Sequence, residues 1–166
     1  MIDVRKAALA TGLLLSFSAP GFQDAGPAGF SAYPALAPFQ GKPAQLDSNS
    51  HVYARRYKTV LSSALASGPN FAGRYVIASW GCGTSCMAHA IVDATTGKVY
   101  VPKAIESSGM NFTCEAEPLV FWRTSRRLLH LKPVAEDTVA VDEYLWEDNW
   151  LRLIGTDKRR MSQICN

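Results

Sequence analysis

The sequence predicts an α+β domain, in which a mainly antiparallel meander sheet carries one amphipathic helix. Two patterns lead to this fold class: short stretches of alternating hydrophobicity after Pro69, and one earlier stretch whose apolar residues recur at spacings of three and four. The chain has 166 residues, of which 48% are hydrophobic and 19% charged. That is enough to bury one hydrophobic core. We therefore expect a single domain over residues 47–166, with the sheet curved or forming a partial barrel.

The helix is predicted between Asp47 and Pro69. Ser48 or Ser50 can cap its first turn, and Gly68 with Pro69 ends it. Its apolar residues follow helical spacing: Val52, Tyr53, Tyr57, Val60, Leu61, Ala64 and Leu65.

About seven short strands are predicted after the helix. The turn "ATTG" between the second and third strands places Gly97 where a positive φ is needed. The strands are expected at residues 70–80, 86–93, 98–101, 119–122, 127–131, 138–146 and 150–154.

The first 18 residues have the pattern of a signal peptide. Arg5 and Lys6 precede an uncharged run, and small residues such as Ser16 and Ser18 suit a signal peptidase. The run of about 13 residues is shorter than the roughly 17 to 25 needed to cross a bilayer. We therefore predict a periplasmic or secreted protein with no permanent membrane anchor.

Residues 19–46 form a Pro/Ala/Gly-rich arm or linker. Its prolines exclude a regular helix or central strand. Aromatic residues recur along it and could dock onto the domain: Phe22, Phe30, Tyr33 and Phe39. Composition favours a linker for its first half.

The net charge argues against a nucleic-acid partner. The chain has 17 Lys and Arg against 14 Asp and Glu, a formal charge of +3. Lys and Arg residues cluster locally in the chain, but no aromatic residues that could stack on bases accompany these clusters.

The segment "WGCGTSCMAH", from Trp80 to His89, predicts a hairpin tip. If Gly83, Thr84 and Ser85 form a three-residue loop, Cys82 stands opposite Cys86 and pairing continues outward. This register predicts one wholly apolar face that includes the two cysteines. It pairs Trp80 with Ala88, Ala78 with Ala90 and Val76 with Val92.

The other face of the hairpin is predicted to be mixed and wetter. It pairs Ser79 with His89, Ile77 with Ile91 and Tyr75 with Asp93. Its exposed aromatic residues make it a second candidate contact surface, formed by Tyr75, Ile77, His89 and Tyr100.

Four cysteines in an exported chain suggest two disulfide bonds, for which three pairings are possible. We favour Cys82 with Cys86 because they are near in sequence, which leaves Cys114 with Cys165. The short ring would add about 2 kcal/mol to stability and the long one about 4 kcal/mol.

Three kinds of chemistry at this hairpin receive less support. A thiol oxidoreductase would need closer cysteines and a helix N-terminus. Cys82, Cys86, Met87 and His89 could be Cu(I) or zinc ligands, but the hairpin register divides them between two faces. Ser85 lacks the "GxSxG" elbow of a nucleophilic serine. We therefore assign no catalytic residue, metal or cofactor.

The sequence resembles a largely uncharacterised family of small exported proteins of Gram-negative bacteria. The residues that carry the resemblance are "PNFAGRYVIASWGCGTSC" followed by "AIVDATTGKV", "TSRRLLHL" and "EYLWEDNWLRLI". The resemblance covers about half the chain, and "NFAGxY...WGCGTxC" is its specific part. It implies a periplasmic location and one compact domain, and it supplies no catalytic residues.

Two functions remain in competition. The first is a non-catalytic binding protein that presents the loop tip, Gly83, Thr84 and Ser85, to a protein partner; by analogy it could be an inhibitor or immunity protein for a cell-wall hydrolase. The second is a thiol–disulfide redox or soft-metal-handling protein that uses Cys82 and Cys86. Titration of free thiols in the native protein would separate them.

Overall fold

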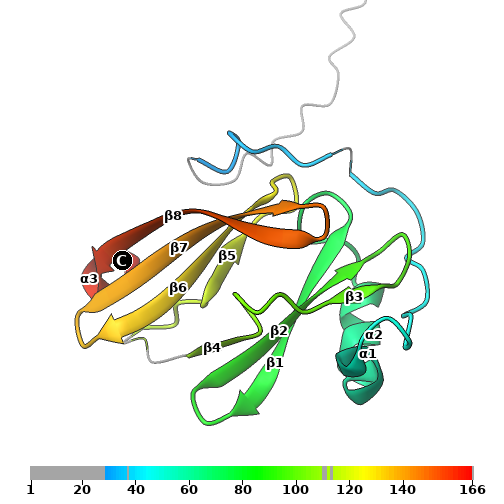
Figure 1. Ribbon diagram of the computed structural model, residues 1–166, viewed down its shortest axis with the longest axis horizontal. Helices are drawn as coiled ribbons and strands as arrows, with labels where there is room; N and C mark the ends of the chain where they lie inside the picture. Colours follow the sequence, from blue (N-terminus) through cyan, green and yellow to red (C-terminus); the bar gives the residue numbers. More distant parts are fainter. Residues whose placement is uncertain (1–28, 37, 110–111, 113, 166) are drawn as a thin grey trace, which may run out of the picture.

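A computed structural model describes residues 29–36, 38–109, 112 and 114–165. This part of the chain is an α+β fold with two antiparallel four-stranded sheets and a few short helices. The predicted fold class is therefore confirmed. Among the described strands the arrangement is two separate sheets and not a closed barrel (Figure 1). The predicted signal peptide, residues 1–18, lies outside the described residues.

The first sheet is built around β2 (Cys86–Asp93). The long strand β1 (Tyr75–Gly83) pairs with it along one edge. Two short strands share its other edge: β3 (Val99–Tyr100) near the end of β2, and β4 (Ser107–Gly109) near its start. Strand β4 was not predicted, because "SSG" has none of the alternating hydrophobicity that indicates a strand.

The second sheet is a simple meander in the order β5-β6-β7-β8. It consists of β5 (Leu119–Phe121), β6 (Arg127–Ala135), β7 (Thr138–Glu147) and β8 (Trp150–Arg160). The strands β6 and β8 extend beyond their predicted ends, into "KPVA" and "GTDKRR". Their neighbours supply backbone hydrogen bonds there, so pairing continues beyond the alternating apolar pattern.

The predicted single helix is interrupted, and this prediction needs correction. It forms α1 (Val52–Arg56) and α2 (Lys58–Ala66), with a break at Tyr57, where φ is −114° and ψ is 31°. The cap also differs, because the Nδ1 atom of His51 accepts the backbone N–H of Tyr53 at 3.0 Å. A third short helix, α3 (Met161–Ile164), follows β8.

The two larger hydrophobic cores lie on opposite faces of the first sheet. One core joins α1 and α2 to the outer face, through residues such as Leu61, Leu65, Val76 and Val92. The other joins the inner face to the second sheet, through Phe71, Ile77, Ile91, Leu128 and Trp146. The layers therefore run helices, first sheet, second sheet (Figure 1).

The second half of the Pro/Ala/Gly-rich segment is an arm that packs on the domain. The side chain of Phe30 is 3% exposed, and its ring lies 6.2 Å from that of Trp122. The hydroxyl of Ser125 donates to the carbonyl oxygens of Phe30 and Tyr33, at 2.8 and 3.0 Å. The described residues 29–36 and 38–46 are thus tied to the sheets by aromatic packing and hydrogen bonds.

Gly97 shows how the same arm reaches the first sheet. Its φ is +74°, as predicted for this turn. A Cβ atom there would stand 1.9 Å from the carbonyl oxygen of Gln45, and the backbone N–H of Asp47 donates to the Gly97 carbonyl at 2.9 Å. Glycine is required both by the turn and by this close approach.

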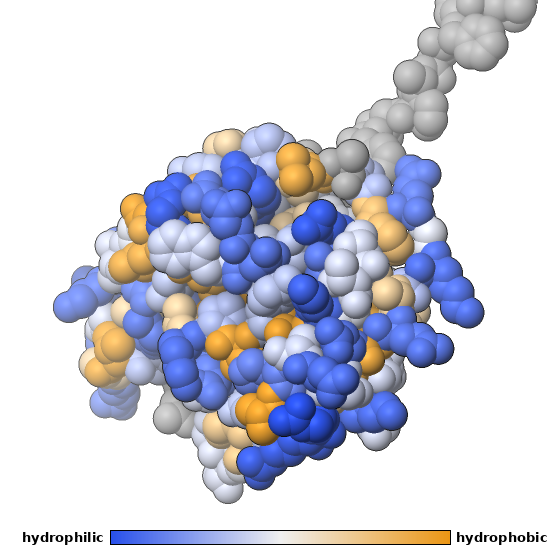
Figure 2. All heavy atoms as spheres, turned by 45° about the vertical axis from the view of Figure 1, so that its right-hand side comes forward, coloured by the Kyte–Doolittle hydropathy of each residue, from blue (hydrophilic) through white to orange (hydrophobic). Residues whose placement is uncertain are grey.

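The surface carries its apolar residues in small separate groups. The face turned toward the viewer in Figure 2 is largely hydrophilic, with hydrophobic residues scattered among polar ones. The large hydrophobic residues that are exposed in the described chain belong to the arm, α1, β6 and β8: Leu36, Val52, Val134, Trp150 and Leu153. Single exposed residues of this kind are ordinary and do not by themselves mark a binding surface.

Candidate functional site

The hairpin tip combines a short turn, a bulge and a disulfide bond. Gly81 pairs with Met87, but Gly83 and not Cys82 pairs with Cys86. Cys82 is therefore the extra residue of a β-bulge, and Thr84 with Ser85 form a two-residue turn. The predicted three-residue loop is wrong by this one residue. Gly83 has φ +142° and Ser85 has φ +52°, so the turn uses left-handed backbone geometry.

The predicted bond between Cys82 and Cys86 is present, with Cα atoms 5.2 Å apart. All residues from Gly81 to Ser85 are exposed. Figure 1 shows this end of β1 and β2 projecting beyond the second sheet. The tip is therefore a narrow, uncharged, covalently closed protrusion.

Trp80 connects this tip to the helices. Its ring centroid lies 4.7 Å from that of Tyr57, at the break between α1 and α2, and 6.2 Å from that of Tyr53 in α1. The predicted apolar face of the hairpin is confirmed from Val76 to Trp80, since Val76 and Ala78 lie in the core beneath α2 and Trp80 packs against it. The cysteines are not part of this core. Within the described part of the chain, the Trp80 indole N–H is buried without a hydrogen-bond partner.

The second disulfide, Cys114–Cys165, also matches the predicted pairing, with Cα atoms 5.6 Å apart. It joins the segment before β5 to the residue after α3. Cys165 packs with Met161, Val139 and Leu131 in a third small core. This bond fastens the C-terminal end of the chain to the second sheet.

The second candidate contact surface is not exposed, and that prediction is wrong. Tyr75, Ile77 and His89 are buried, and Tyr100 is partly buried against Trp146, with ring centroids 5.8 Å apart. The second sheet covers this face. Alternation along a strand shows that two faces differ, but it does not show whether water or another sheet covers the polar one.

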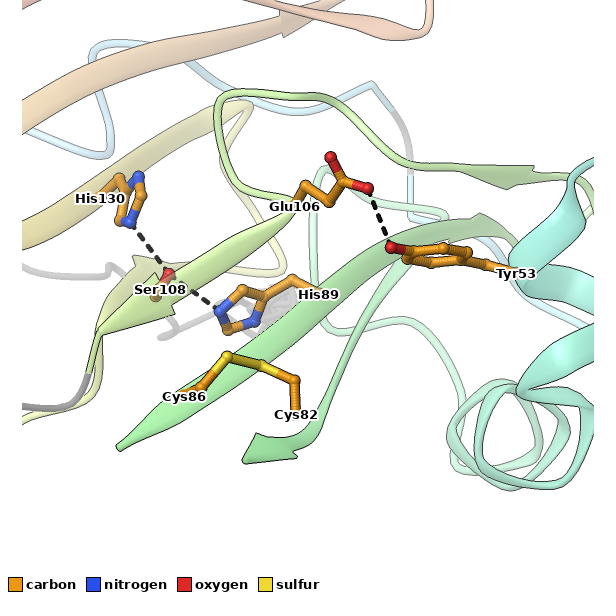
Figure 3. The surroundings of a disulfide bond; sticks show 7 residues. All are labelled: Tyr53, Cys82, Cys86, His89, Glu106, Ser108 and His130. Carbon is orange, nitrogen blue, oxygen red and sulfur yellow. Dashed lines mark hydrogen bonds between the residues drawn. A yellow bond between two sulfur atoms is a disulfide. The ribbon is translucent and has the colours of Figure 1, made fainter. Parts of the chain in front are cut away.

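A chain of hydrogen bonds on this face starts at the exposed Ser79 and joins the two sheets. Ser79 Oγ lies 2.8 Å from His89 Nδ1, and His89 Nε2 lies 3.0 Å from Ser108 Oγ. Ser108 Oγ lies 2.9 Å from His130 Nε2, and His130 Nδ1 lies 2.9 Å from the carbonyl oxygen of Ala104. Figure 3 shows Ser108 between the two imidazole rings.

One link of this chain, the cross-strand pair Ser79 and His89, was predicted from the hairpin register. Ser108 and His130 were not predicted, because they lie 19 and 41 residues from His89 along the chain, on β4 and β6. A local pattern carries no signal for such a contact.

Burial shapes the electrostatics of both histidines. His89 is 1% exposed and His130 is 4% exposed. Burial, with a smaller effect of His130, lowers the pKa of His89 to about 4. Burial also lowers the pKa of His130, although its hydrogen bond to Ala104 and the charge of Asp142 oppose this. Both rings are therefore neutral at pH 7.

Another polar group borders the helices. The hydroxyl of Tyr53 donates to Glu106 Oε1 at 2.9 Å, and Lys103 Nζ donates to Glu106 Oε2 at 2.6 Å (Figure 3 draws the first of these bonds). These hydrogen bonds, that of Lys103 first, lower the pKa of Glu106. The group ties α1 to the loop before β4 and lies at the surface.

The candidate soft-metal ligands are not brought together. Cys82 and Cys86 are bonded to each other, and His89 is held by two serines in the buried chain. In the described residues, there is no group of three or more His, Cys, Asp or Glu side chains placed to hold a metal ion.

The same part of the chain contains no helix long and apolar enough to span a membrane.

Comparisons with known proteins found no matching family model, no similar curated protein and no similar solved structure. The resemblance to a family of exported proteins therefore stays a prediction. The fold and the geometry of the tip and of the buried chain are the basis for the functional argument.

Proposed function

We propose that this protein is an exported binding protein that inserts its disulfide-closed hairpin tip into a concave site on a partner protein. The observation that carries the proposal is that all of residues 81–85 are exposed, on a hairpin whose strands are joined by the Cys82–Cys86 bond. A tip that is already ordered loses little conformational entropy on binding.

The surroundings of the tip support this role. Trp80 packs against Tyr57 behind the tip, with the two rings tilted, so the base of the hairpin is held by the helices. Thr84 and Ser85 offer hydroxyl groups without charge. The tip projects, as an element that enters a cleft must. By analogy with small exported inhibitors, we propose a cell-wall hydrolase in the periplasm as the class of partner, with the predicted signal peptide providing export.

The alternative is a redox role for the same disulfide. Its support is the exposure of Cys82, which an external thiolate could reach. The described chain offers this bond no helix N-terminus that would stabilise a thiolate: α1 and α2 lie on the outer face beside Trp80, and α3 lies beside the other disulfide. Binding is therefore the better supported of the two functions.

The experiment measures inhibition of a panel of lysozymes and peptidoglycan amidases acting on purified cell walls. The test variant is Thr84→Lys with Ser85→Glu. The matched control is Thr59→Lys with Ser63→Glu, which places the same side chains on the exposed side of α2. We expect the tip variant to lose inhibition and the helix variant to keep it.

Equal inhibition by both variants would exclude the tip as the binding element. A redox role gives a different result. Cys86→Ser would abolish disulfide exchange with a small thiol, whereas the tip variant would keep it. No inhibition of any hydrolase, together with rapid exchange, would favour the redox alternative.

A further inference from the structure

The buried hydrogen-bond chain ends at one exposed hydroxyl group. Ser79 is exposed, whereas His89, Ser108 and His130 are 1%, 5% and 4% exposed. The last member of the chain meets solvent and lies 2.8 Å from the Nδ1 atom of a buried imidazole.

The direction of every hydrogen bond in the chain follows from its inner end. The carbonyl oxygen of Ala104 can only accept, so His130 Nδ1 carries the proton and Nε2 of the neutral ring accepts from Ser108. The Ser108 oxygen is then free to accept from His89 Nε2–H. His89 Nδ1 is left with its lone pair, and it must accept the proton of Ser79.

Hydrogen bonds in these directions can activate a serine as a nucleophile. The Ser79 hydroxyl donates to a neutral imidazole whose other nitrogen is held by a second group. Ser108 orients the His89 ring and fixes its tautomer, so it is a positioning residue.

A pocket lies at the reactive end of the chain. Ser79 and His89 both line it, and its volume is about 320 Å³. The facing wall comes from residues 119–122 of β5 and the adjoining loop, which are Leu, Val, Phe and Trp, and Glu117 also contributes to the lining. A pocket of this size with mainly apolar walls fits a small apolar group beside the Ser79 hydroxyl.

We infer that Ser79 is a nucleophilic serine that reacts with carboxylic esters whose small apolar acyl group occupies this pocket. Ser79 Oγ forms a bond to the ester carbonyl carbon while its proton passes to His89 Nδ1. The ester C–O bond then breaks, and His89 returns the proton to the departing alcohol oxygen. A water molecule next attacks the acyl-serine and gives a proton to His89, which returns it to Ser79 Oγ as the carboxylic acid leaves.

The pKa of His89 defines the esters that suit this site. An imidazole with a pKa of about 4 is a weak base but a ready proton donor once charged. Aryl esters, whose leaving groups need little assistance, are therefore the right probes. p-Nitrophenyl acetate and a fluorophosphonate that labels activated serines are used on the full-length protein.

The test compares Ser79→Ala with Ser107→Ala, which removes another exposed serine hydroxyl from the same sheet. We expect fluorophosphonate to label Ser79 in the wild-type protein, as located by peptide mass spectrometry. Ser79→Ala should reduce p-nitrophenyl acetate hydrolysis to the buffer rate, and Ser107→Ala should leave it unchanged. Ser108→Ala should lower the rate by about tenfold or more, because His89 loses the group that orients it.

The pH dependence gives a second readout, taken only at pH values where the protein remains folded. The titratable groups around His89 are His130, which faces it across Ser108, and Glu117 in the pocket lining. The rate should rise with pH around a midpoint well below 6.5, as His89 becomes neutral. Glu117→Gln should keep this midpoint if His89 is the group that titrates.

Two results would overturn the proposal: hydrolysis that persists in Ser79→Ala, or fluorophosphonate label on another residue. The tip variant Thr84→Lys with Ser85→Glu should hydrolyse the ester normally. This proposal and the binding proposal can therefore fail separately.

Discussion

His89 and His130 belong to different sheets and share a single hydroxyl group, that of Ser108, at 3.0 and 2.9 Å. Their rings are both neutral in this arrangement, because the hydroxyl donates to one ring and accepts from the other. Protonation of both rings would leave Ser108 with two donors facing it and would place two positive charges in the interior. The junction between the sheets is therefore sensitive to acid.

We predict that the protein loses stability as the pH falls from about 6.5 toward 4. The folded state lowers the pKa of both histidines, so the unfolded chain binds more protons than the folded protein in this window. Proton binding stabilises the unfolded chain, and the free energy of unfolding falls. A tenfold change in a proton-binding constant corresponds to about 1.4 kcal/mol, so the lowered pKa of His89 alone accounts for a few kcal/mol. Urea unfolding at pH 7 and pH 4.5 measures the difference.

The control for this prediction is the double variant His89→Asn with His130→Asn, which should be less stable at pH 7 but should lose most of the dependence in this window. Asp142 and Lys132 lie close to His130. Burial raises the pKa of Asp142, but its hydrogen bonds, that of Lys132 first, outweigh burial and hold this pKa below its usual value. That carboxylate therefore titrates at lower pH. An unchanged slope in the variant would show that other groups cause the acid sensitivity.

Trp80→Ala is expected to destabilise the protein by about 3 kcal/mol, the lower end of the range for large aromatic deletions. The ring is only partly buried, but it packs on Tyr57 and Tyr53 at the break between the helices. Trp150→Ala is the matched control, because its side chain is 54% exposed, and it should change stability by less than about 1 kcal/mol. Similar losses in the two variants, measured by chemical unfolding, would contradict the packing role of Trp80.

Removal of the two disulfides should have unequal effects. Cys114 and Cys165 are 51 residues apart, whereas Cys82 and Cys86 are four apart. Loop-closure entropy then gives about 4 kcal/mol for the long bond and about 2 kcal/mol for the short one. Thermal unfolding of two double variants measures this difference. One variant is Cys114→Ala with Cys165→Ala, and the other is Cys82→Ala with Cys86→Ala. A larger loss from the second pair would mean that the tip supports the fold more than its exposure suggests.

Export predicts that the mature chain begins between Ala19 and about Ser31. The structure favours a start before Phe30, because that ring is buried and its carbonyl oxygen accepts from Ser125. N-terminal sequencing of protein recovered from the periplasm checks this. An intact Met1 in that material would exclude cleavage.

Much of the hairpin could be predicted from local sequence. The pairing from Tyr75 with Asp93 to Gly81 with Met87 was predicted by placing Cys82 opposite Cys86, and the alternation of the two faces agrees with it. The disulfide pairing followed from the nearness of Cys82 and Cys86. The bulge at Cys82 was not predictable, because the sequence shows that glycines permit a reversal but not which residue is left unpaired.

The features that local sequence specifies in this protein are strand alternation, the apolar side of the helical segment, the glycine turn at Gly97 and the hairpin tip. What covers each sheet face depends on the packing of the whole chain, and this packing places His89 in a buried contact where alternation indicated a wet surface. Ser108 and His130 reach that contact from distant strands. Long-range packing selects such neighbours by burying apolar surface and satisfying buried polar groups, and neither requirement leaves a periodic signal in the sequence.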